Sequence, residues 1–75
     1  MDRAQEREHL AQADRHIAEL KAHIARHGDI VKRALNTGRP SELAETTLRL
    51  FEDSLRIIEK HRELILDQLK RRSSA

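Results

Sequence analysis

Histidine is the residue type in this chain whose spacing suggests chemistry. His9, His16 and His23 recur every seven residues, and His27 follows His23 by four. Residues four apart share one helix face, so His23 and His27 could both bind one zinc ion. A closed zinc site needs four ligands, and a dimer could supply more by duplicating His16 and His61. These four histidines, His16, His23, His27 and His61, are candidate ligands, but the sequence does not predict a metal site.

Other catalytic groupings are absent from the sequence. The 75 residues include no cysteine, which excludes disulfides and thiolate chemistry. There is no glycine-rich phosphate loop and no nucleophile beside a placed base. We therefore predict that the protein is not an enzyme and binds no cofactor.

Few residues in this chain can reverse its direction, since it contains two glycines and one proline. The one cluster of turn formers runs from Asn36 through Gly38 and Pro40 to Ser41, which suits the end of one helix and the start of another. We predict a single all-α domain over residues 1–75, an antiparallel two-helix hairpin. Its parts are a helix over 4–36, a turn over 37–40, a helix over 41–71 and a frayed tail over 72–75.

A heptad repeat runs through the first predicted helix and favours coiled-coil-like packing. Gly28 lies inside this repeat and costs about 1 kcal/mol relative to alanine, without ending the helix. Positions a of the repeat are Leu10, Ile17, Ile24 and Val31, and positions d are Ala13, Leu20, His27 and Ala34.

The second predicted helix has an apolar face too wide for one partner helix. Its a and d positions face those of the first helix when residue numbers add to 75, which sets Ala13 opposite Arg62 and leaves room for the arginine stem. A further apolar row recurs at position c. The predicted core and interface residues are Leu10, Ile17, Leu20, Ile24, Val31, Leu48, Leu50, Phe51, Leu55, Ile57, Ile58, Leu64, Ile65 and Leu69.

A second copy of the hairpin would cover that additional row. Two hairpins packed face to face give a homodimeric four-helix bundle. Within each hairpin, positions g face each other when residue numbers add to 77, which aligns His16 with His61 and His23 with Ser54. We expect this polar ladder to be partly buried and to fix the register of the helices.

The stretch HLAQADRHIAELKAHIAR, from His9 to Arg26, resembles a group of short, uncharacterised alphaproteobacterial proteins that carry an HLAxAxRHIA…HIAR motif before a second helix. The second half of the chain is similar to that group only as a leucine-rich helix of comparable length. The resemblance implies a small bacterial helical protein and carries over no function or site residue.

Together these patterns predict a non-catalytic helical interaction or regulatory module that acts through self-association and a protein partner. One alternative is a small helical bundle that binds nucleic acid through its Arg and Lys residues, although Phe51 is the only aromatic residue for base stacking. Another is a histidine-based metal or pH sensor. No apolar run could cross a membrane, and the lack of cysteine agrees with a cytoplasmic location.

Overall fold

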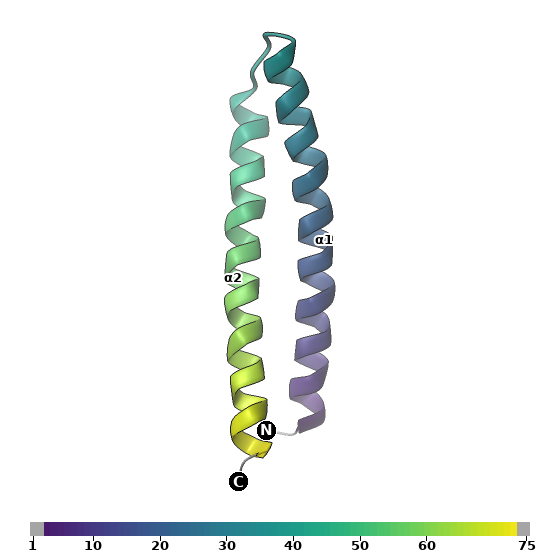
Figure 1. The fold of residues 1–75 in the computed structure, drawn as a ribbon, viewed down its shortest axis with the longest axis vertical. Coiled ribbons are helices and arrows are strands. Elements are labelled where there is room, and N and C mark those ends of the chain that lie inside the picture. The colour runs from purple at the N-terminus through teal and green to yellow at the C-terminus, as the bar shows by residue number, and fades with distance from the viewer. Residues whose placement is uncertain (1–2, 74–75) are drawn as a thin grey trace.

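The chain folds into two long α-helices, α1 (Arg3–Asn36) and α2 (Glu42–Ser73), joined by one turn. The computed structural model describes residues 3–73 and the side chains of residues 3–71. The helices lie side by side along their whole length, with the turn at one end of the molecule (Figure 1). The Cα positions span 59 × 15 × 14 Å. The predicted antiparallel all-α hairpin is therefore confirmed.

The helix boundaries lie close to those predicted. Helix α1 begins at Arg3 and ends at Asn36. Helix α2 begins one residue later than expected, after Ser41, and continues to Ser73, two residues into the segment predicted as a frayed tail. The last two residues of that predicted tail, 74 and 75, lie outside the described part of the chain.

Helix α1 ends in a Schellman motif centred on a glycine. Gly38 has a φ of 73°, in the left-handed region that favours glycine. The N–H of Gly38 donates to the carbonyl of Leu35 at 3.1 Å, and the N–H of Arg39 donates to the carbonyl of Ala34 at 2.8 Å. These bonds satisfy carbonyl groups that the helix end would otherwise leave without partners. They also reverse the direction of the chain, so that it continues as α2 alongside α1.

Helix α2 starts with a serine cap. The N–H of Ala44 donates to the Ser41 side-chain oxygen at 3.2 Å, and the N–H of Glu45 donates to the Ser41 carbonyl at 3.1 Å. Pro40 precedes this cap, and Glu42 and Glu45 occupy the first turn, where the helix dipole favours negative charge. The turn therefore combines a glycine at the end of α1 with a serine cap at the start of α2, and both were visible in the sequence.

The core lies in the seam between the two helices. From Glu6 to Leu69, every a and d position is buried or half-buried, while every b, c and f position is exposed. Among the described apolar side chains, only Ala13, Leu20 and Ile65 are buried. One helix pair therefore leaves most seam side chains only half-buried, because each seam residue has neighbours on only one other helix.

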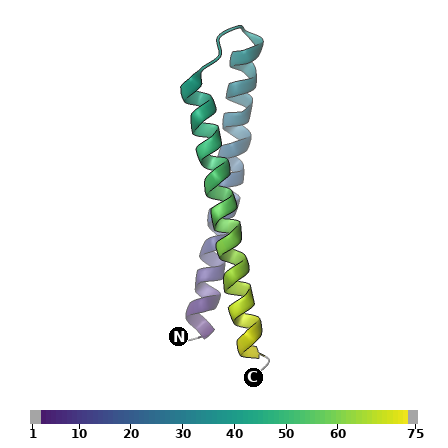
Figure 2. The ribbon, with the colours of Figure 1, turned by 90° about the vertical axis from the view of Figure 1, so that its left-hand side faces the viewer.

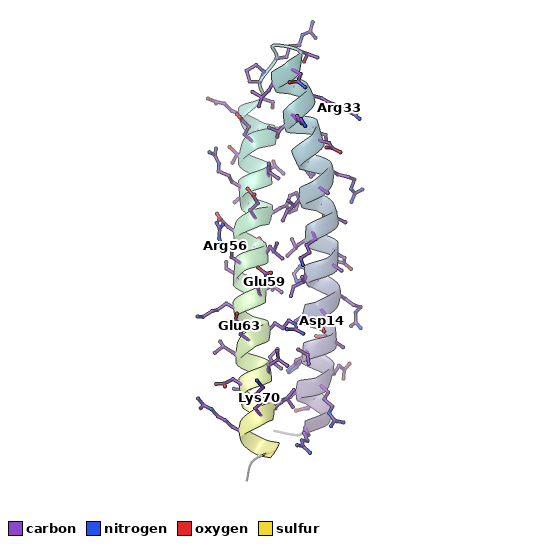
Figure 3. The ribbon with its side chains drawn as sticks, viewed as in Figure 1. Asp14, Arg33, Arg56, Glu59, Glu63 and Lys70 are labelled. Atoms are coloured by element: carbon purple, nitrogen blue, oxygen red, sulfur yellow. The ribbon has the colours of Figure 1, made fainter. Side chains whose placement is uncertain are left out.

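An ion pair across the seam agrees with the predicted register of the two helices. The Nε of Arg62 donates to Oδ1 of Asp14 at 2.5 Å. Ala13, next to Asp14 in the sequence, is buried, as expected for a seam residue at the level of Arg62. Figure 2 shows the two helices crossing near the middle of the rod, and Figure 3 shows Asp14 reaching from α1 toward α2.

Candidate functional site

The most exposed large apolar side chains of the described chain form a row along α2. They occur every seven residues at position c, on the side of α2 that does not face α1, and are between 55% and 77% exposed. We call this set the outer row, and its members are Leu43, Leu50, Ile57 and Leu64. Isolated exposed leucines are common, but large apolar residues repeated at one heptad position along a 32-residue helix are typical of an interaction surface.

An apolar groove borders the outer row near mid-length. Its volume is about 370 Å³. Small Ser54 leaves space between larger side chains, and Ile57 of the outer row forms one wall. We call it the Phe51 groove, and its lining residues are His16, Leu20, Phe51, Ser54, Ile57 and Ile58. Since α1 contributes His16 and Leu20, the groove joins the outer row to the seam between the helices.

Three histidines gather on the same side of the hairpin. His9, His16 and His61 line a cavity of about 170 Å³, with Gln12, Ala13 and Ile58 as the other lining residues. The predicted alignment of His16 with His61 is thus consistent with this cavity. All three imidazoles are exposed in the hairpin, although partial burial was expected. The reason is that one helix pair covers mainly positions a and d, and position g lies at the edge.

The other two histidines contact the only phenylalanine. The His23 ring stacks on Phe51 with centroids 5.1 Å apart and planes 11° apart, and the His27 ring tilts against Phe51 at 5.0 Å. The Arg26 guanidinium donates to Nδ1 of His23 at 3.1 Å. These contacts give His23 and His27 a packing role against Phe51.

The carboxylates of the described chain do not complete a metal site. No group of three or more His, Asp or Glu residues within residues 3–71 is arranged to hold a metal ion. Among the candidate ligands His16, His23, His27 and His61, the structure instead places two against Phe51 and two around the histidine-lined cavity. It supplies no observation that favours the metal alternative.

Several charged groups on the outside of α2 pair along the helix. Arg56 pairs with Asp53, and Arg71 pairs with Asp67 at 3.2 Å. Arg56 points away from α1 (Figure 3). Ion pairs this exposed contribute little to stability. Their guanidinium groups are already close to carboxylates, which does not favour the nucleic-acid alternative.

Glu6 and Leu66 are among the partly or fully buried residues that were not identified from the sequence. Glu6 is 2% exposed, and Leu66 is half-buried. Glu6 occupies position d one heptad before Ala13, so extending the repeat by seven residues would have located it. Leu66 occupies position e, beside the seam, where heptad rules predict partial burial less reliably.

The fold and its surfaces define an all-α helical hairpin with one completed seam and one exposed apolar face. Neither described helix has an apolar stretch that could span a bilayer. Comparison with protein-family models, curated proteins and solved structures finds no match for this chain.

Proposed function

We propose that this protein is a non-catalytic helical interaction module that acts through self-association, with the outer row as its contact surface. The observation that carries the proposal is the contrast in burial. Three apolar side chains of the described chain are buried, whereas the four in the outer row are each more than half exposed. Long helices gain most of their stability from packing of an apolar face, and this face has no cover within the hairpin.

The size of the face agrees with a second copy as the partner. The Cα positions span 59 × 15 × 14 Å, so a long side has a projected area of about 800 Å², which gives room for the roughly 800 Å² of accessible surface that each partner buries in a stable complex. Two hairpins that share this side form a four-helix bundle, in which each α2 packs against two neighbours. A further protein partner could use the remaining faces of the bundle.

Sedimentation equilibrium tests this proposal directly. The chain has a mass of 8.7 kDa, and we expect a species of twice that mass. Leu50→Gln should weaken association by about 2 to 4 kcal/mol per dimer, since two leucine side chains that are 61% exposed in the hairpin would no longer be buried. A folded wild-type chain that stays monomeric at high micromolar concentration would refute the proposal.

Leu35→Gln is the matched control. Leu35 is also an exposed leucine, at 53%, but it occupies position e of α1, on the opposite side of the hairpin from the histidines. The same chemical change there should leave the association constant unchanged. An equal effect of both substitutions would show that association does not use the outer row.

A further inference from the structure

The outer row belongs to a second heptad seam on α2. Positions g and c alternate at spacings of three and four residues, as a and d do in a coiled coil. Large apolar residues occupy c, while small or polar residues occupy g. The seam reads Leu43, Thr47, Leu50, Ser54, Ile57, His61, Leu64 and Gln68. A surface of this kind fits another helix with the same alternation, because large side chains can enter the spaces beside small ones.

Resting on the self-association proposed above, we infer that α2 packs antiparallel against α2 of a second copy, in the register where facing residue numbers add to 111. This register places Ile57 of each copy beside Ser54 of the other. Ser54 lines the Phe51 groove of about 370 Å³, so the groove receives the partner's isoleucine. Leu64 faces Thr47 of the second copy in the same way, again a large residue beside a smaller one.

Charge complementarity supports the same register. Position f flanks this seam on the side away from α1, and in antiparallel pairs such flanking residues face each other when their numbers add to two more than the core value. Asp53 of one copy then faces Lys60 of the other, and the two-fold symmetry produces this pair twice. Both side chains are exposed in the hairpin, and Asp53 can exchange its pairing with Arg56 for the partner's lysine.

Other arrangements of the same seam are less favourable. In the two neighbouring antiparallel registers, where facing numbers add to 104 or to 118, Asp53 meets Asp53 or Lys60 meets Lys60 of the second copy. The first of these also leaves the α2 helices overhanging by about 16 Å. The proposed register leaves an overhang of only about 6 Å. In a parallel pair, position f of one copy would face position d of the other, so Asp53 would lie beside Ile58 of the second copy and no Asp53–Lys60 pair would form.

Charge exchange between two variants tests this register. Asp53→Lys places two lysines at each of the paired positions, and Lys60→Asp places two aspartates there. Each variant alone should dimerise more weakly, on the order of ten-fold in dissociation constant. When they are mixed, every flanking pair becomes opposite in charge. Native mass spectrometry can resolve the two chains by their mass difference, and we expect the heterodimer to exceed the one-half share of random mixing.

Two further variants complete the experiment. The double variant Asp53→Lys with Lys60→Asp restores opposite charges and should return to wild-type affinity. Asp67→Lys is the matched control, since it makes the same charge change at position f but faces Thr46 of the second copy. It should leave dimerisation within two-fold of the wild type. High salt should reduce the differences among all variants, because exposed pairs are screened.

The outcomes separate this inference from the proposed function. A wild-type dimer whose charge-reversed variants mix at random, or whose double variant stays weak, would overturn the antiparallel register and leave self-association intact. A folded wild-type monomer would overturn both. Circular dichroism of each variant confirms that the helices persist, so that loss of the dimer is not loss of the hairpin.

Discussion

The two glycines of the chain should respond in opposite directions to the same substitution. Gly28 lies within α1, and a Cβ added there would meet no atom within 4 Å. Gly28→Ala should therefore stabilise the protein by about 0.5 to 1 kcal/mol per chain, because alanine is the better helix former. Gly38 also has open space but a φ of 73°. Gly38→Ala should destabilise by about 1 to 2 kcal/mol, since L-residues disfavour that conformation.

Urea unfolding followed by circular dichroism at 222 nm measures both effects. The chain concentration must be the same for all three proteins, because the stability of an associating chain depends on it. In thermal unfolding, each kcal/mol corresponds to roughly 4 to 8 °C for a domain of this size. Destabilisation by Gly28→Ala would show that α1 does not continue unbroken through Gly28. A neutral Gly38→Ala would contradict the Schellman motif.

Two further experiments test the turn and the seam. Ser41→Ala should cost about 1 kcal/mol in the free energy of unfolding, because the Ala44 N–H loses its side-chain acceptor; Thr46→Ala, at an exposed site within α2, should cost nothing. A double-mutant cycle with Asp14→Ala and Arg62→Ala should give a coupling energy of about 0.5 to 1 kcal/mol that falls in 1 M salt, since both groups are partly exposed. A coupling near zero at low salt would contradict the ion pair across the seam.

The features predictable from the sequence are those set by local periodicity. The turn residues determine where the chain reverses, and the reversal then aligns the heptads of the two helices. For this reason Ala13 and Arg62 could be placed on facing helices before the structure was known. The ion pair between Asp14 and Arg62 follows from that register, because the Arg62 guanidinium has to reach only one residue beyond Ala13.

Features that depend on side-chain conformation could not be predicted in this way. Heptad positions place His23 and His27 on the side of Phe51, but they do not say whether the imidazoles stack on the ring or turn to a shared ligand. That choice depends on rotamers and on Arg26, which donates to His23. The exposure of His16 in the hairpin was also not predicted. Partial burial had been inferred for a four-helix bundle, whereas a single hairpin leaves position g at the edge of its seam.

The elongated shape of the hairpin determines how assembly would alter its scattering. The radius of gyration is 17.0 Å, whereas a compact 75-residue domain would have about 11 Å. A thin rod of 59 Å has a radius of gyration of about 17 Å, so length accounts for almost all of the observed value. Side-by-side pairing adds width but little length. Association should therefore increase the cross-sectional radius of gyration of the rod and double its mass per unit length. The overall radius of gyration should stay close to that of one hairpin.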